Sequence, residues 1–162
     1  MAKKIDAINR KQYGAVTVML TVTDIKAAAA FYQKALGFTR RGGFMNGPDG
    51  KPMHAEPRLR DTTLMLGPEG PQARSAKSIG LTPVTPYLST EAVDKVIGKA
   101  FKLGARSLVP VRDQFWSDRT GTIVDPEGNT WMIATHIAGP TPQEMKKKMA
   151  EMTKSQATTS SA

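Results

Sequence analysis

The chain has 162 residues, no cysteine and a formal net charge of +9, with 40% hydrophobic and 23% charged residues. This length suffices for one domain with a real core, and the lack of cysteine excludes disulfides, thiolate nucleophiles and cysteine-ligated zinc. No apolar run approaches the ~20 residues of a membrane helix, and the amino terminus lacks the apolar segment of a secretory signal. We therefore expect a cytoplasmic protein with no membrane partner.

Part of the positive charge lies at the two ends of the chain. Residues 1–12 carry +3 and residues 138–162 carry +2, which leaves +4 for the middle. Nucleic-acid binding usually requires a basic stripe with aromatic stacking platforms, or a known module, and the sequence shows neither. We expect solvated basic ends and no specific nucleic-acid site. A basic protein that touches nucleic acid remains an alternative.

The first half of the chain predicts a βαβββ module over residues 15–66, after a polar leader at residues 1–14. Residues 15–23 alternate as a strand does, and Asp24 can cap the helix expected at residues 25–36. Gly37 follows this helix, as glycine often follows a helix end. Three further strands are expected at residues 39–45, 53–59 and 62–66.

The pattern repeats in a second module, residues 83–137, after a loop at 67–78 that is rich in Gly, Pro, Ala and Ser. Strands are expected at 84–90, 107–112, 120–124 and 130–137, with a helix at 91–103. Gly37 and Gly104 lie 67 residues apart, and so do Met65 and Met132. A fixed period indicates two copies of one unit. The predicted fold class is therefore α+β: two βαβββ modules forming a curved, cup-shaped mixed sheet.

Residues 138–162 predict a C-terminal helix and a disordered tail. Thr141-Pro142-Gln143-Glu144 has the form of a capping box with proline at the first helical position. Met145, Met149 and Met152 then fall on one stripe of the helix. We expect this stripe to dock on the same domain or on a dimer partner.

The run FWSDRTGTIVDPEGNTW, residues 115–131, with the ATH that follows, resembles the last hairpin of the vicinal-oxygen-chelate (VOC) superfamily. This superfamily includes glyoxalases, bleomycin-resistance proteins and extradiol dioxygenases, and the resemblance is greatest to its PhnB-like branch. It covers residues 15–137 and implies a cup-shaped binding site, often in a homodimer. Because the superfamily hosts unrelated chemistries on one scaffold, the resemblance predicts the fold better than the activity.

In the metalloenzymes of that superfamily, the first and last strands of each module supply the metal ligands. The corresponding positions in this chain are Thr17, Met65, Thr85 and Met132. Hydroxyl and thioether groups do not suit a hard divalent cation, so we predict no metal and no cofactor. These four residues, with Phe115 and Trp116, instead predict an apolar pocket for a small hydrophobic or aromatic molecule. The expected function is a metal-free binder, such as a sequestering or resistance protein.

An enzyme is the alternative function, and it would depend on His54 and Glu56. If Met53 and Ala55 face the helix, His54 and Glu56 face the cup. They could then act as a general base or a polar anchor, in a glyoxalase-like lyase or isomerase. A satisfied ion pair at a strand edge is the structural interpretation of the same residues.

Three other polar residues have weaker interpretations. His136 lies at the end of the last strand, where a surface or loop-bonding role is expected. A relocated metal site built from His54, Glu56 and His136 is a further alternative. Asp118 and Arg119 are expected to pair with each other or with the next turn as structural residues.

Overall fold

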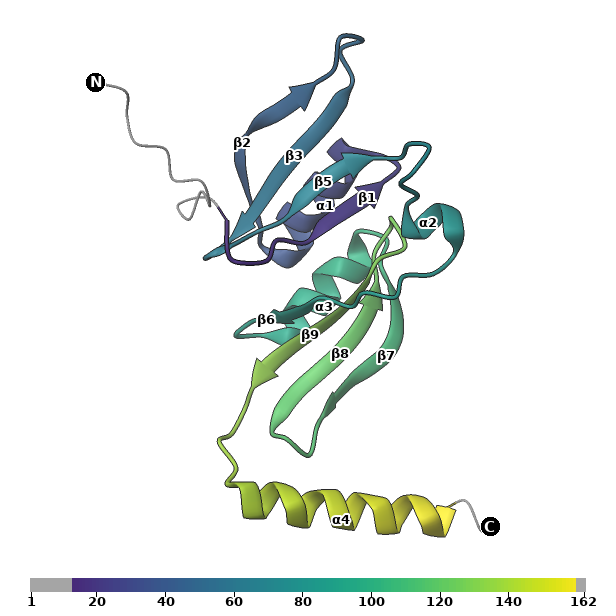
Figure 1. Cartoon of the computed structure of the whole chain (residues 1–162). Coiled ribbons are helices and arrows are strands. Elements are labelled where there is room, and N and C mark those ends of the chain that lie inside the picture. The colour runs from purple at the N-terminus through teal and green to yellow at the C-terminus, as the bar shows by residue number, and fades with distance from the viewer. Residues whose placement is uncertain (1–12, 160–162) are drawn as a thin grey trace, which may run out of the picture.

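The computed structural model describes residues 13–159, with side chains as far as residue 151. Figure 1 shows two modules, followed by a C-terminal helix that stands apart from them. The first module contains β1 (Met19–Val22), α1 (Ile25–Leu36), β2 (Thr39–Asn46), β3 (Pro52–Leu59), β4 (Thr62–Thr63) and β5 (Met65–Pro68). A short helix, α2 (Ala76–Ile79), precedes the second module, which contains β6 (Tyr87–Ser89), α3 (Val93–Lys102), β7 (Arg106–Asp113), β8 (Asp118–Val124) and β9 (Thr130–His136). The chain ends in α4 (Pro142–Thr159). The predicted polar leader lies almost entirely outside the described residues.

The two modules have the same topology. The strand order is β1-β5-β3-β2 in the first sheet, with β4 also paired to β3, and β6-β9-β8-β7 in the second. In each module the first strand runs parallel to the last, and the remaining pairs are antiparallel. The predicted α+β fold with a duplicated βαβββ unit is therefore confirmed.

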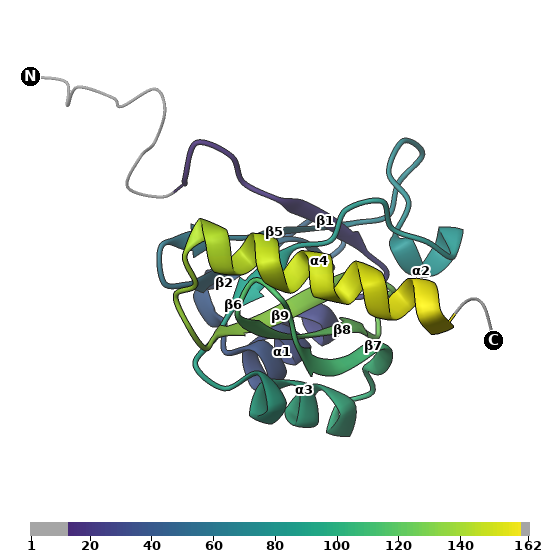
Figure 2. The ribbon, with the colours of Figure 1, turned by 90° about the horizontal axis from the view of Figure 1, so that it is seen from below.

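Helices cover one face of the two sheets. α1 packs on the first sheet, α3 packs on the second, and the two helices contact each other. We call the face away from α1 and α3 the open face. Seen from below, α1 and α3 lie on one side of the second-module sheet and α4 lies on the other (Figure 2). Because alternate strand residues point to opposite faces, Leu20 and Val22 are buried under α1 while Met19 lies on the open face.

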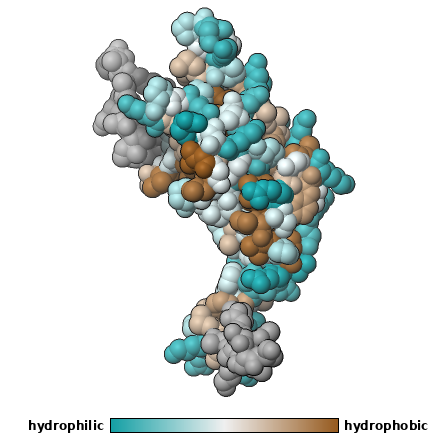
Figure 3. Space-filling view, turned by 90° about the vertical axis from the view of Figure 1, so that its right-hand side faces the viewer, coloured by the Kyte–Doolittle hydropathy of each residue, from teal (hydrophilic) through white to brown (hydrophobic). Residues whose placement is uncertain are grey.

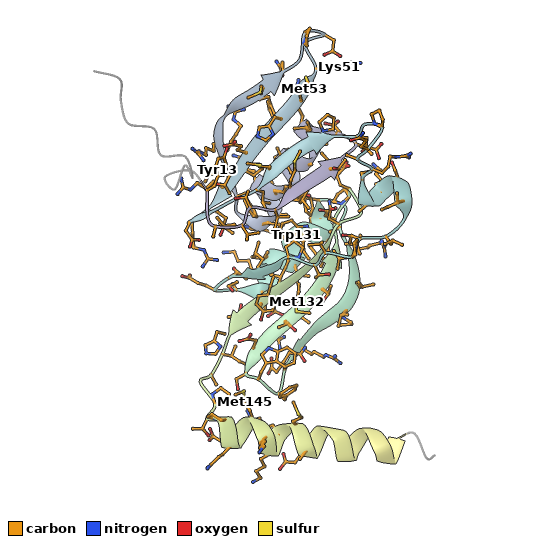
Figure 4. All side chains as sticks on the ribbon, viewed as in Figure 1. Tyr13, Lys51, Met53, Trp131, Met132 and Met145 are labelled. Atoms are coloured by element: carbon orange, nitrogen blue, oxygen red, sulfur yellow. The ribbon has the colours of Figure 1, made fainter. Side chains whose placement is uncertain are left out.

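A cluster of aromatic rings joins the two modules. The ring of Trp131, from β9, lies 5.4 Å from that of Tyr32 and 6.1 Å from that of Phe38, both in the first module. Figure 4 shows Trp131 between the modules. Asp125 accepts hydrogen bonds from the Tyr32 hydroxyl (2.8 Å) and the Trp131 indole (3.0 Å). Burial raises the pKa of the Tyr32 hydroxyl well above its usual value, and the adjacent Asp125 carboxylate raises it further.

The turn after β8, residues 125–129, also binds the first module through the carboxylate of Glu127. Glu127 accepts hydrogen bonds from the backbone nitrogen of Thr23 (2.6 Å) and from its hydroxyl (2.9 Å). The turn itself is closed by bonds from the backbone of Glu127 and Asn129 to Asp125, both 2.9 Å. The acidic turn at residues 125–129 therefore connects the two modules through its hydrogen bonds. We call this turn the clasp.

The ends of α1 match the sequence prediction, whereas α3 begins two residues later than predicted and some strands also begin later. Asp24 caps α1 by accepting from the nitrogen of Ala27 (3.0 Å), and Gly37 ends the helix at φ 82°. β1 begins four residues later than predicted, and β6 begins three residues later. Proline delays β6, because Pro86 has no N–H and contributes only its carbonyl, which accepts from Met132 (3.1 Å).

The fourth predicted strand of the first module is broken at Leu64. The Leu64 nitrogen donates to the Pro57 carbonyl (2.8 Å), so the chain pairs with β3 before it and joins β1 only from Met65 onward. The loop predicted at residues 67–78 also contains the start of α2.

The C-terminal helix has the predicted capping box and continues to Thr159, into the segment expected to be a disordered tail. Glu144 accepts from the nitrogen of Thr141 (2.7 Å), and the Thr141 hydroxyl accepts from the nitrogen of Glu144 (3.3 Å). Lys148 donates to Ser117, in the β7–β8 turn, at 3.5 Å. Met149 is exposed, and Met152 lies beyond the described side chains. Among the described helices, none has both the length and the apolar character needed to cross a bilayer.

Candidate functional site

Methionine side chains lie on the open face of both modules. Met19 pairs with Met65 across β1 and β5, and Met132 pairs with Tyr87 across β9 and β6. We call Met19, Met65 and Met132 the methionine floor. Met19 is 60% exposed, and the other two are half-buried. Figure 3, seen from the right-hand side of Figure 1, shows separate hydrophobic patches on the two modules among hydrophilic surface.

Thr17 and Thr85 lie outside the strands in which they were predicted. Thr17 is half-buried two residues before β1, and Thr85 is exposed two residues before β6. The residues that pair with Met65 and Met132 are consequently Met19 and Tyr87. Neither was singled out from the sequence, because a strand's register depends on where its ladder begins.

A cavity of about 370 Å³ opens at the seam between the modules. This volume lies within the usual range for small-molecule sites. Its walls are mainly apolar and come from both modules, since Val18, Phe38 and Leu64 face Tyr87, Leu88 and Trp131. Arg60 also borders the cavity, and its guanidinium donates to the carbonyl of Ser89 (2.6 Å). Tyr87 belongs to both the cavity and the open face.

The first polar cluster surrounds Glu56 on the open face. His54 Nε2 lies 3.2 Å from Glu56 Oε1, Arg41 Nη1 lies 3.5 Å from Oε2, and the Tyr13 hydroxyl donates to Oε1. Ala55 is buried on the helix side, as expected for the alternation that turns His54 and Glu56 to the open face. The guanidinium of Arg41 also lies 5.7 Å from the centre of the Tyr13 ring.

This cluster resembles an anchor more than a general base. Partial burial by itself would raise the pKa of Glu56, but the hydrogen bonds from Tyr13 and His54 and the charge of Arg41 lower it below its usual value. The bond to Glu56 in turn raises the pKa of Tyr13. A carboxylate with three partners and a lowered pKa has little tendency to take a proton. Catalytic roles for His54 and Glu56 therefore remain predictions.

The second polar cluster surrounds Asp118 on the open face of the second module. Its carboxylate accepts hydrogen bonds from the Tyr87 hydroxyl (2.6 Å), from His136 Nδ1 (2.7 Å) and from the Trp116 indole nitrogen (3.2 Å). Trp116 also packs edge-to-face on Phe115, with ring centres 4.9 Å apart. The bond from Tyr87, helped by those from His136 and Trp116, lowers the pKa of Asp118. Burial and the bond to Asp118 raise the pKa of Tyr87 to about 12.

One of the two expected arrangements, pairing of Asp118 with Arg119, is wrong. Adjacent residues of a strand point to opposite faces, and Arg119 instead binds Asp94 of α3 and Asp113 of β7, both at 2.8 Å. The sequence did contain a signal for the actual partner. Counting outward from the turn at residues 125–129 places Asp118 opposite His136, as observed.

The residues that the structure describes do not form a site for a divalent metal. Within residues 13–159, no group of three or more His, Asp or Glu side chains is placed to hold an ion. His54 and Glu56 belong to the first-module cluster and His136 to the second, so the structure does not assemble the relocated site. The methionine floor offers thioethers, and the phenol of Tyr87 is bound to Asp118, so hard oxygen and imidazole donors are missing there.

Residues 14–133 match the sequence model of the Glyoxalase/Bleomycin resistance protein/Dioxygenase superfamily. The chain belongs to this superfamily. Uncharacterized proteins of Mycobacterium bovis and Mycobacterium tuberculosis are 34% identical over 141 residues, which is 84% of this chain and 92% and 82% of the respective relatives.

Solved structures share the fold at lower identity. TioX from a Micromonospora species has a TM-score of 0.58 and 22% identity, over 79% of this chain and all of that one. A glyoxalase/bleomycin resistance protein/dioxygenase family enzyme from Burkholderia phytofirmans has a TM-score of 0.56 and 16% identity, over 75% of this chain and 97% of that one. These likenesses establish the superfamily fold; the PhnB-like branch remains a prediction.

Proposed function

We propose that this protein binds a small hydrophobic or aromatic molecule on the open face, without a resident metal ion. The observation that carries this proposal is the methionine floor. The superfamily resemblance implies that Met65 and Met132 stand where its metalloenzymes hold ligands. An apolar cavity of about 370 Å³ adjoins Tyr87, which pairs with Met132. Burial of apolar ligand surface against thioethers and aromatic rings would supply the binding energy.

The role we propose is that of a binder, such as a sequestering or resistance-type protein of the cytoplasm. Two observations support binding over catalysis. Glu56 is engaged by three partners, and Asp118 is engaged by three others, so neither carboxylate is poised to accept a proton. A glyoxalase-like reaction through His54 and Glu56 has no specific observation in its favour.

We also propose a homodimer. The helix α4 extends for 18 residues and stands away from the two modules in Figure 1. A long helix gains most of its stability from packing rather than from intrinsic propensity. A second copy of the chain would provide such packing for α4, whose described side chains are exposed except for the half-buried Met145.

The test of the proposed function is binding of 2-methoxynaphthalene, an aromatic probe without a hydroxyl group, measured by calorimetry. Met132→Lys places a charge on the methionine floor and should abolish the binding heat. The matched control is Met53→Lys, because Met53 is 53% exposed on the helix side of β3. Equal loss in both variants, or full binding by Met132→Lys, would contradict the proposed site.

Native mass spectrometry with elemental analysis provides the second test. The expected result is a dimer without a stoichiometric divalent ion, with or without a co-purifying apolar molecule. One tightly bound divalent ion per chain, lost in Met65→Ala or Met132→Ala, would overturn the metal-free proposal.

A further inference from the structure

One carboxylate fixes three rings on the open face of the second module. Asp118 accepts hydrogen bonds from Tyr87 of β6, from Trp116 of the β7–β8 turn and from His136 of β9. We propose that these residues recognise the hydroxyl group of an aromatic ligand, and that Nε2 of His136 accepts its hydrogen bond. This inference rests on the proposed function and deepens it, since it names the chemical class of the ligand.

The hydrogen bond to Asp118 fixes which nitrogen of His136 is available. An ionised carboxylate only accepts hydrogen bonds, so Nδ1, at 2.7 Å, must carry the proton. In the neutral ring Nε2 is then an acceptor. The His136 side chain is 69% exposed, which leaves this edge of the ring accessible. A partner of Nε2 must donate, and an aromatic hydroxyl is a donor attached to a flat apolar group.

The flat part of such a ligand has a platform beside His136. Tyr87 starts opposite Met132 on one side of β9, and its hydroxyl reaches Asp118, which lies opposite His136 on the other side. The phenol ring therefore crosses β9 between Met132 and His136, above the small side chain of Ala134. Two strand residues span about 7 Å, so a ring stacked on Tyr87 can bring its hydroxyl to His136.

The platform is rigid because each ring is held at its polar end. Tyr87 is 49% exposed, yet its hydroxyl is fixed at 2.6 Å from Asp118. Trp116 is held by its indole nitrogen and by the edge-to-face contact with Phe115. Side chains that are already ordered lose little further freedom when a ligand binds, which favours affinity.

The other histidine does not offer the same arrangement. His54 presents Nε2 to Glu56, at 3.2 Å, and its side chain is only 23% exposed. Glu56 is shared there with Arg41 and Tyr13, so the first-module cluster carries a cation beside its imidazole. Hydroxyl recognition is therefore assigned to His136, and His54 serves as the internal comparison.

The chain has only two histidines, so nitrogen-15 NMR of the imidazoles tests the tautomer directly. His54→Gln removes one set of signals and assigns the other to His136. In the neutral form of the unliganded protein, His136 should carry its proton on Nδ1. Predominant protonation on Nε2 would overturn the inference.

Ligand binding tests the recognition step with 2-naphthol and its methyl ether, 2-methoxynaphthalene. In wild type, 2-naphthol should bind about tenfold more tightly, as expected for one hydrogen bond, and should shift the Nε2 signal of His136. His136→Phe keeps a ring but no acceptor, so it should bind both probes equally. Its circular dichroism and unfolding temperature verify that it folds.

The outcomes separate this inference from the proposed function. Equal binding of both probes by wild type would overturn hydroxyl recognition and leave aromatic binding intact. Binding of neither probe would overturn both. A tenfold preference for 2-naphthol that persists in His136→Phe would overturn the assignment to His136.

Discussion

Two aspartates of the second module have the same kind of partners and different uses. Asp125 and Asp118 each accept from a tyrosine hydroxyl and a tryptophan indole. Around Asp125 the two rings, from Tyr32 and Trp131, are buried and join the modules. Around Asp118 the rings lie on the open face, where a ligand can reach them. The difference lies in what covers the rings, not in the bonds.

Asp125→Ala should lower the free energy of unfolding by about 3 kcal/mol, since it leaves the buried hydroxyl of Tyr32 and the indole of Trp131 without their acceptor. Urea unfolding measures this change. Glu91→Ala is the control, because Glu91 is exposed, and should change stability by less than about 0.5 kcal/mol. Similar effects of the two substitutions would contradict the role of Asp125 as a clasp.

Asp118→Asn should reduce stability in a pH-dependent way. The bonds from Tyr87, His136 and Trp116 hold the pKa of Asp118 below its unfolded value, so its ionised form stabilises the fold. This stabilisation is present above about pH 4 and is lost as the pH falls below it. We expect wild type to exceed the variant by about 1 kcal/mol near neutral pH, and the gap to close in acid. A gap that widens toward low pH would be the contrary result.

At the scale of elements, α2 packs against the clasp, the turn at residues 125–129. Gly128 has φ +84°, and a Cβ added there would lie 2.7 Å from the backbone nitrogen of Lys77, in α2. Backbone cannot move aside as a flexible side chain can. The connection between the modules therefore brings the backbone of α2 into close contact with Gly128. No feature of the sequence indicates this contact.

Gly128→Ala should therefore lower the free energy of unfolding by about 2 kcal/mol, through the strained φ and the clash with α2. Gly98→Ala is the matched control. Gly98 lies within α3 with nothing near its added Cβ, so alanine should raise stability there by about 0.5–1 kcal/mol. Opposite signs in thermal unfolding are the expected result, and two stabilising substitutions would refute the close contact.

Elements defined by local chemistry could be predicted from the sequence, whereas strand starts could not. Asp24, Gly37 and the Thr141–Glu144 capping box each act within one turn of chain, and the structure has all three. Where β6 begins depends on its partner β9, and Pro86 delays the start. Because of this later start, Tyr87 and not Thr85 pairs with Met132. The sequence alone therefore did not indicate Tyr87.

At the scale of the whole molecule, all three tyrosines donate to carboxylates. Tyr13 binds Glu56, Tyr32 binds Asp125 and Tyr87 binds Asp118. Hydrogen bonding to Glu56 raises the pKa of Tyr13, while burial is the larger cause for Tyr32 and Tyr87. The protonated phenols stabilise the folded state, and this stabilisation is present below their unfolded pKa of about 10.

Alkaline titration should show the effect in phenolate absorbance. The folded protein should form little phenolate at about pH 10, where unfolded tyrosines are half-ionised. Stability should fall as the pH rises from about 10 toward 12, because the unfolded state ionises first. Protein in denaturant is the reference. Ionisation of a whole tyrosine near pH 10 in the folded protein would contradict the three bonds.

The two modules share one strand order, but their open faces carry different side chains. The first-module wall carries Arg41 and the Glu56 cluster, and the second carries the carboxylate with its three rings. A molecule that lies across the seam thus meets an ion-paired polar end and an aromatic end. The two ends of the site therefore differ in chemistry, so an asymmetric ligand would match both of them, whereas a ligand with identical ends would match only one.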